Sequence, residues 1–139
     1  ASDVYKRQVR YPERFERKAQ PPQAALQLWT ETIGEKMLYT IHQPNIRLGR
    51  SSSSRQSEIE IDLSRFDQQR VISRYHASIE LKNDQYYLVD HHSHNGTWLN
   101  GVALTPETPY PLRNGDKIQL GSQRPHGIQI IFTLTSPSP

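Results

Sequence analysis

The sequence Asn95-Gly96-Thr97-Trp98-Leu99-Asn100-Gly101 is the stretch that decides the fold. Two Asn-Gly dipeptides stand three residues apart, and two of the residues between them are large and apolar. Asn-Gly is a strong turn signal because both residues accept a positive φ at little steric cost. The stretch therefore predicts a loop, a very short strand and a second turn. It has no obvious nucleophile, base or metal ligand. Its asparagine side-chain amide and free backbone groups favour binding of another polypeptide.

Short alternations of apolar and polar residues flank this stretch on both sides. They predict strands at 26–30, 37–41, 45–49, 59–63, 77–81, 86–90, 98–99, 102–104, 110–112, 117–120 and 128–134, and 64–70 is expected to make a short turn. Gly, Asn and Asp turns recur about every ten residues, and no amphipathic helix stands out. The predicted fold class is therefore all-β, a sandwich of two sheets.

Composition excludes several classes of protein. The chain has 139 residues, 34% of them hydrophobic, and no cysteine, which rules out disulfides, thiolate zinc ligands and a cysteine nucleophile within this piece. No apolar run approaches the roughly 20 residues that span a bilayer, and no signal peptide opens the chain. We therefore expect a cytoplasmic domain. The net charge of +3 is mild, and the basic residues gathered in the first 18 positions are either a solvated tail or a nucleic-acid contact.

The predicted organisation is a basic, proline-containing linker at 1–25, one domain at 26–134 and a tail at 135–139, with a flexible serine-rich loop at 51–57. Both ends, Ser2 to Gln8 and Thr135 to Pro139, resemble translated sequencing-adaptor read-through. We accordingly expect an internal piece of a longer protein, with about eight artefactual residues at its start.

Four motifs follow one another in a fixed order: Leu48-Gly49-Arg50, Ser73-Arg74-Tyr75-His76-Ala77, Ser93 to Gly101, and Leu112-Arg113-Asn114-Gly115-Asp116-Lys117-Ile118. Their order and spacing resemble the forkhead-associated (FHA) domain, a phosphothreonine-peptide binding module, here a bacterial member. The resemblance covers 26–134 and implies an FHA-type β-sandwich of about 10 or 11 short strands with its binding loops at one end. The implied function is phosphorylation-dependent protein–protein interaction in signalling.

The residue types suit a phosphate, which carries a charge of about −2 and three acceptor oxygens. Arg50 offers a guanidinium for bidentate pairing, and Gly49 before it permits close backbone approach. Ser73 supplies a hydroxyl donor, and Arg74 either a second guanidinium or a rim side chain paired with a carboxylate. Asn95 has donors and an acceptor for both an N–H and a C=O of a bound peptide.

The histidines and glycines have other predicted roles. The resemblance implies that His76 holds the binding loops by hydrogen bonds rather than acting as a base. Residues expected to shape the loops are Gly49, Gly96, Thr97, Asn100 and Gly101. The chain departs from the family at His92, where a small residue or glycine is usual, at His94, and in a long 51–72 stretch. His94 at the rim is predicted to strengthen phosphate binding when protonated.

Other functions remain as alternatives. His91, His92 and His94 with Asp90 have metal-ligating side chains, but neighbours on an extended segment point apart, so we expect no metal and no cofactor. The runner-up is a phosphate-independent FHA-fold scaffold. No P-loop, nucleophile elbow or carboxylate pair predicts an enzyme. The expected partner is a phosphothreonine protein, such as a substrate or autophosphorylated form of a Ser/Thr kinase, bound by a monomeric module of a larger protein, with neither nucleic acid nor membrane as a partner.

Overall fold

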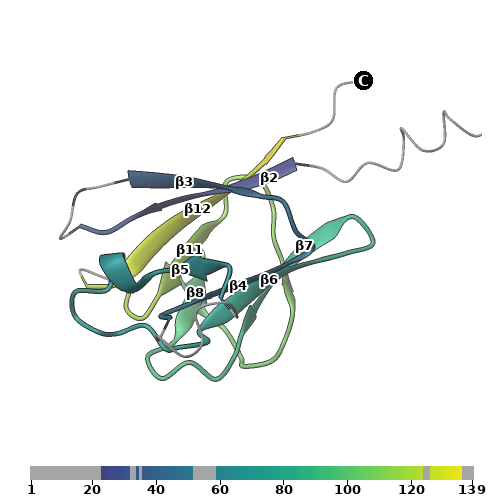
Figure 1. The fold of residues 1–139 in the computed structure, drawn as a ribbon. Coiled ribbons are helices and arrows are strands. Elements are labelled where there is room, and N and C mark those ends of the chain that lie inside the picture. The colour runs from purple at the N-terminus through teal and green to yellow at the C-terminus, as the bar shows by residue number, and fades with distance from the viewer. Residues whose placement is uncertain (1–22, 32–33, 35, 52–58, 124–125, 136–139) are drawn as a thin grey trace, which may run out of the picture.

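The computed structural model describes residues 23–31, 34, 36–51, 59–123 and 126–135. Its strands form a five-stranded and a six-stranded sheet (Figure 1), which confirms the all-β sandwich. The strands are β2 (Gln23–Trp29), β3 (Lys36–Ile41), β4 (Asn45–Gly49), β5 (Ile61–Asp62), β6 (Ala77–Lys82), β7 (Gln85–Asp90), β8 (Thr97–Leu99), β9 (Val102–Ala103), β10 (Tyr110–Pro111), β11 (Lys117–Leu120) and β12 (Ile128–Thr135).

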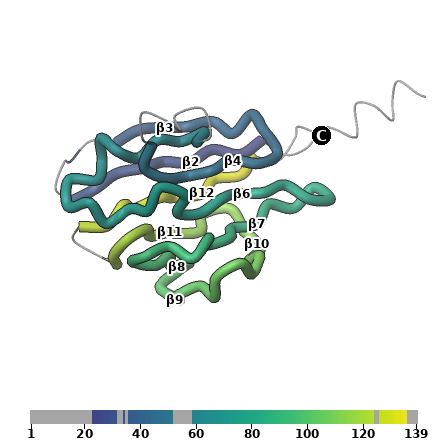
Figure 2. The backbone as a smooth tube through the Cα atoms, turned by 60° about the horizontal axis from the view of Figure 1, so that its bottom comes forward, coloured from purple at the N-terminus to yellow at the C-terminus, as the bar shows by residue number. Residues whose placement is uncertain are grey.

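The six-stranded sheet has the order β3-β2-β12-β11-β8-β9, and every neighbouring pair in it is antiparallel. Figure 2 shows these strands following one another across the molecule. β2 begins at Gln23, earlier than the predicted Leu26, because Ala24 and Ala25 continue the ladder against Leu134 and Thr133 of β12. The strands β2 and β12, from the two ends of the described chain, therefore lie side by side in this sheet.

The five-stranded sheet has the order β10-β7-β6-β4-β5. Its β5 is shorter than the strand predicted at 59–63 and pairs with β4 in parallel, with Leu48 opposite Ile61. A short 3₁₀ helix, Ser64–Phe66, follows and accounts for part of the turn expected at 64–70. It buries the Phe66 side chain, so this connection also contributes to the core.

The core lies between the two sheets and follows the alternation in the sequence. Leu26 and Leu28 of β2 are fully buried and stand opposite Phe132 and Ile130 of β12, which are equally buried. Side chains at alternate positions of a strand point to the same face, so one such face of each sheet turns inward. Each large side chain buried in this way stabilises the fold by roughly 1.5–3 kcal/mol.

Some predicted segments lie outside the described residues. These are positions 1–22 of the basic linker, 52–57 of the serine-rich loop, and 136–139 of the tail. In the part of the chain that the structure describes, no helix has the length and apolarity needed to cross a membrane.

Candidate functional site

The strand register brings three separate loops to one end of the five-stranded sheet. Leu48 of β4 lies opposite Ala77 of β6, and Ala77 lies opposite Asp90 of β7. Ala77 begins β6, Asp90 ends β7, and Leu48 is the last residue but one of β4. The chain that leaves β4, the chain that enters β6 and the chain that leaves β7 must therefore meet there. These three connections carry the predicted phosphate and peptide residues.

The backbone of residues 71–73 is the common support of the site. The Val71 carbonyl accepts a hydrogen bond from the Asn95 side-chain amide at 3.0 Å. The next carbonyl, of Ile72, accepts one from Arg50 Nε at 3.1 Å, and the Ser73 carbonyl accepts the Arg50 backbone N–H at 3.1 Å. Three successive carbonyls thus fix residues of the other two loops.

The N–H groups of the same segment also have partners. The Asp67 carboxylate, which is buried, accepts the N–H of Val71 at 2.7 Å and of Ile72 at 3.0 Å. The Ser73 N–H donates to Nδ1 of His76 at 3.0 Å. Sequence reasoning missed Asp67, although an aspartate within a predicted turn is a common acceptor for backbone amides a few residues on.

His76 joins this segment to the loop before β8. Because its Nδ1 accepts a hydrogen bond, the proton of the neutral ring lies on Nε2, which donates to the Gly96 carbonyl at 2.8 Å. His76 is completely buried, and this burial lowers its pKa, although the hydrogen bond to Gly96 and the charges of Asp90 and Asp67 act in the opposite direction. The neutral ring therefore fits the site.

Asp90 organises the loop that carries Asn95. Its buried carboxylate accepts the Thr97 hydroxyl at 2.6 Å, the Ser93 hydroxyl at 2.5 Å and the Ser93 N–H at 3.2 Å. The Ser93 hydroxyl oxygen in turn accepts the Gly96 N–H at 3.1 Å. The sequence suggests Asp90 only as a metal ligand, although its position at the end of a strand, three residues before Ser93, is the signal for this role.

Gly49 occupies a position where only hydrogen fits. A Cβ built on it would lie 1.9 Å from the Arg74 carbonyl oxygen. The Gly49 carbonyl also accepts the Leu63 N–H at 2.7 Å. The glycine therefore allows β4 to approach the loop before β6 closely, and this approach places Arg50 beside Ser73.

The groups that face outward are those suited to an anion. The Ser73 hydroxyl oxygen accepts the His94 N–H at 2.9 Å, so its own hydrogen remains available for donation. Arg74 and His94 are exposed and Arg50 is half-buried. Among the described residues, neither these arginines nor His94 forms an ion pair, and the Arg50 Nη atoms make no hydrogen bond. To the residues that the structure describes, the Asn95 side chain donates one amide hydrogen, which leaves the other hydrogen and the oxygen for a ligand.

A carboxylate fixes the chain immediately after Arg50. Asp62 accepts the backbone N–H and hydroxyl of Ser51 and of Ser64, at distances from 2.6 to 3.2 Å. Burial acts to raise the pKa of Asp62, but these hydrogen bonds outweigh it and lower the pKa to about 2. Asp62 is therefore ionised at neutral pH, and its carboxylate accepts hydrogen bonds from within the domain.

The second Asn-Gly turn lies away from the binding loops. Asn100, with φ 51°, donates from its side chain to Asp116 at 3.0 Å and accepts the Lys117 N–H at 2.9 Å. With Gly101 it forms the turn between β8 and β9, whereas Gly96 and Thr97 lie at the other end of β8. The structure therefore does not bring Asn100 and Gly101 into direct contact with the binding loops, and they shape the opposite end of the strand.

The histidines before Asn95 point to different partners. His91 lies 2.8 Å from the Ser78 hydroxyl and 3.2 Å from the Glu107 carboxylate, with its ring 4.3 Å from that of Tyr75. His92 lies 3.9 Å from Glu107 and has φ 55°, which explains why glycine is favoured there. In the described part of the chain, no group of three possible ligands gathers around one point.

A profile of the FHA domain matches residues 46–121, more than half of the 139 residues, and the chain belongs to this family. The FHA domain is a recognition module rather than a catalytic fold. Protein FraH of Nostoc sp. is 42% identical over 62 residues, which cover 45% of this chain. The chain spans only 22% of the length of that relative.

Solved structures show the same fold. The FHA domain of an Arabidopsis thaliana hypothetical protein is 29% identical and superposes with a TM-score of 0.65 over 86% of this chain and 91% of that one. A second solved FHA domain, studied for its phosphothreonine-dependent interactions, is 26% identical with a TM-score of 0.59, over 84% of this chain and 98% of its own.

Proposed function

We propose that this domain binds phosphothreonine-containing segments of other proteins and so mediates phosphorylation-dependent interaction in signalling. The observation that supports it most is that Arg50, Ser73 and Asn95 share the backbone of residues 71–73 as a rigid support. Their remaining donors, with the exposed guanidinium of Arg74, are available to a ligand. A site that is ordered before binding loses little side-chain entropy when the ligand arrives.

Each residue has a distinct role in this proposal. The Arg50 Nη groups and the Ser73 hydroxyl donate to phosphate oxygens, and Arg74 assists at the exposed side. Asn95 uses its free amide hydrogen and its oxygen to bind the peptide backbone next to the phosphothreonine. His94 adds charge at the rim when it is protonated. The process is reversible recognition and involves no bond making or breaking.

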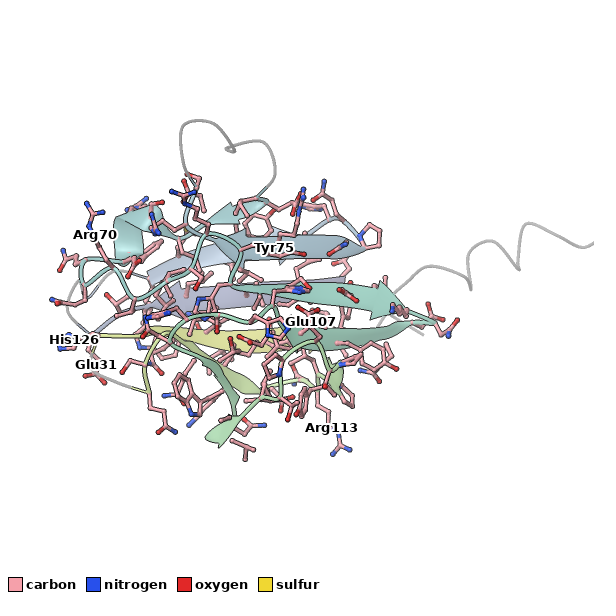
Figure 3. The ribbon with its side chains drawn as sticks, turned by 90° about the horizontal axis from the view of Figure 1, so that it is seen from below. Glu31, Arg70, Tyr75, Glu107, Arg113 and His126 are labelled. Carbon is pink, nitrogen blue, oxygen red and sulfur yellow. The ribbon has the colours of Figure 1, made fainter. Side chains whose placement is uncertain are left out.

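The experiment begins with an oriented phosphothreonine peptide library, which yields a preferred sequence. Isothermal titration then compares that peptide with its unphosphorylated twin on the native domain and on Arg50→Ala. We expect the twin not to bind. Arg50→Ala should weaken binding of the phosphopeptide by roughly 3 kcal/mol, which is about 100-fold in affinity, because two charge-assisted hydrogen bonds are lost. Arg113→Ala is the matched control, since Arg113 lies in a turn away from the site (Figure 3).

Two results would contradict the proposal. Equal affinity for the phosphorylated and unphosphorylated peptides would show that the phosphate is not read. A physiological partner that stays bound to Arg50→Ala would favour the phosphate-independent scaffold instead. Identified partners are then expected to include a Ser/Thr kinase substrate or an autophosphorylated kinase.

A further inference from the structure

A second concave surface lies on the outer face of the six-stranded sheet. Trp29 of β2, Gln129 of β12 and Gln119 of β11 stand opposite one another in one cross-strand row. Their neighbours along each strand are buried in the core, so these three side chains point to the other face. The same row continues to Lys36 of β3 beside Trp29 and to Trp98 of β8 beside Gln119, so two indoles and two amides lie along it with one lysine at its end.

This face is hollowed into a groove of about 470 Å³, a volume typical of ligand sites. One wall comes from Gln123, whose carbonyl accepts Gln119 Nε2 at 2.6 Å and whose side chain reaches the Gly101 carbonyl at 3.5 Å. We call this the outer groove; it is lined by Trp29, Glu31, Asn100, Gly101, Lys117, Ile118, Gln119, Gln123, Gln129, Ile130 and Ile131. None of the proposed phosphate-binding residues lines it.

The floor of the outer groove contains an unsatisfied donor. Gln129 Nε2 is shielded from water, and no hydrogen-bond acceptor for it occurs within the described ranges. A buried donor without a partner costs about 1–3 kcal/mol. Rotation of this half-buried side chain toward the groove would let a ligand carbonyl accept the hydrogen bond, and carbonyl oxygens recur at every residue of a polypeptide.

The two ends of the outer groove carry opposite charges. Glu31 lies two residues beyond Trp29, while Lys117 stands opposite Ile131, on the other side of the row. Figure 3 shows Glu31 at one end of the sandwich, near His126. Both charged residues are exposed, and in the portion of the chain described neither forms an ion pair.

The register limits the distance between these charges. Trp29 and Lys117 are two positions apart along the strands and two strands apart across the sheet, which is about 12 Å at about 3.4 Å per residue and 4.8 Å per strand. Glu31 lies two residues beyond Trp29, in the turn that follows β2, and adds at most about 7 Å. An extended chain of about four to six residues covers this distance.

We propose that the outer groove binds an extended, unphosphorylated polypeptide segment of a partner protein, independently of the phosphate site. An acidic residue of the segment pairs with Lys117, and a basic residue about five positions away pairs with Glu31. Between them, an apolar side chain packs on the Trp29 indole and a backbone carbonyl accepts Gln129 Nε2. The domain would then read two features of its partners: a phosphothreonine at the rim and a charge-paired segment on the sheet.

The test uses a phage-displayed library of random unphosphorylated peptides, selected on the Arg50→Ala domain so that the phosphate site does not contribute. We expect enriched peptides to carry opposite charges four to six residues apart. The double variant Glu31→Lys/Lys117→Glu should bind the enriched peptides at least tenfold more weakly. It should instead bind peptides in which the two charges are exchanged. Lys82→Glu, on the other sheet, is the control and should leave their affinity unchanged.

The exchanged residues are exposed, and retained binding of the rim phosphopeptide by the double variant would show that it is folded. The proposal is overturned if no charge-paired peptide is enriched, or if the enriched peptides bind the double variant as well as the native domain. It is also overturned if sedimentation shows a dimer that the double variant abolishes, because a second copy would then occupy the groove. Loss of phosphopeptide binding in Arg50→Ala tests the rim alone, so the two proposals fail separately.

Discussion

The Nε2 atom of His76 lies 2.8 Å from the carbonyl oxygen of Gly96 and joins the loop before β6 to the loop before β8. The opposite ring nitrogen accepts the Ser73 N–H, so a second proton on the ring would break that contact. Burial lowers the pKa of His76 in the folded domain below the ordinary histidine value of 6.5. The protonation state of this side chain is thus coupled to the order of the phosphate site.

The first prediction concerns stability against pH. The unfolded chain takes up a proton on His76 below about pH 6.5, while the folded domain does so only at lower pH. The free energy of unfolding should therefore be highest above pH 6.5 and fall as the pH drops below it. Urea unfolding of the native domain and of His76→Gln, at a series of pH values, measures this. The variant should be less stable at pH 7.5, but its free energy of unfolding should fall less between pH 7 and 5.5. If the free energy of unfolding falls equally in the two proteins over this range, the prediction is wrong.

The second prediction concerns Gly49. Gly49→Ala places a methyl group against the Arg74 carbonyl, and the backbone must shift to relieve the overlap. We expect a loss of roughly 2–4 kcal/mol in thermal or urea unfolding, together with weaker phosphopeptide binding, because Arg50 moves with β4. Gly115→Ala is the comparison, since Gly115 has φ +89° but open space around it and should cost only about 1–2 kcal/mol.

The third prediction concerns Asp90. In Asp90→Asn, one carboxylate oxygen is replaced by an NH₂ group, which cannot accept the Ser93 N–H. The loop of residues 93–97 should loosen at a cost of about 1–3 kcal/mol, and the phosphopeptide affinity should fall because Asn95 belongs to that loop. Asp84→Asn, in the exposed hairpin turn between β6 and β7, provides the matched control. Unchanged affinity in Asp90→Asn would show that the loop is held by other contacts.

The fourth prediction concerns His94. Its exposed side chain makes no hydrogen bond to the described residues, so it is available to a ligand at the rim. Between pH 8 and 6, phosphopeptide affinity of the native domain should rise relative to that of His94→Gln. The ionisation of the phosphate itself affects both proteins equally and cancels in the ratio. A constant ratio across this range would remove His94 from the recognition site.

The strands could be predicted because a buried sheet face leaves a periodic trace in the sequence. Leu26 and Leu28, or Ile59 to Leu63, alternate with polar residues, and turn residues mark where each strand stops. The pairing of strands leaves no such trace. Nothing in the sequence of β5 indicates that it pairs in parallel with β4, with Ile61 opposite Leu48. That pairing depends on the path of the whole chain and not on the local pattern of residues.

In the candidate site, too, some residues could be predicted from the sequence and others could not. Arg50, Ser73 and Asn95 stand in recognisable motifs, so they could be named in advance. Asp67 could not, because it acts only on the backbone amides of Val71 and Ile72, and any aspartate in a turn has the same local appearance. The outer groove was also missed, since it depends on a register that aligns Trp29, Gln129 and Gln119 from three distant segments.

The support provided by residues 71–73 has an evolutionary consequence. Their amides and carbonyls depend on Asp67, His76 and the approach at Gly49, so these positions cannot change without disturbing the fold. Among the described residues, neither the guanidinium of Arg74 nor the Nη groups of Arg50 makes a hydrogen bond that supports the loops. Under the proposed function, a single codon change at position 50 would remove phosphate recognition at the cost of one supporting hydrogen bond, from Arg50 Nε to the Ile72 carbonyl, and its reversal would restore recognition. A domain built in this way could gain or lose dependence on a kinase without having to evolve a new fold.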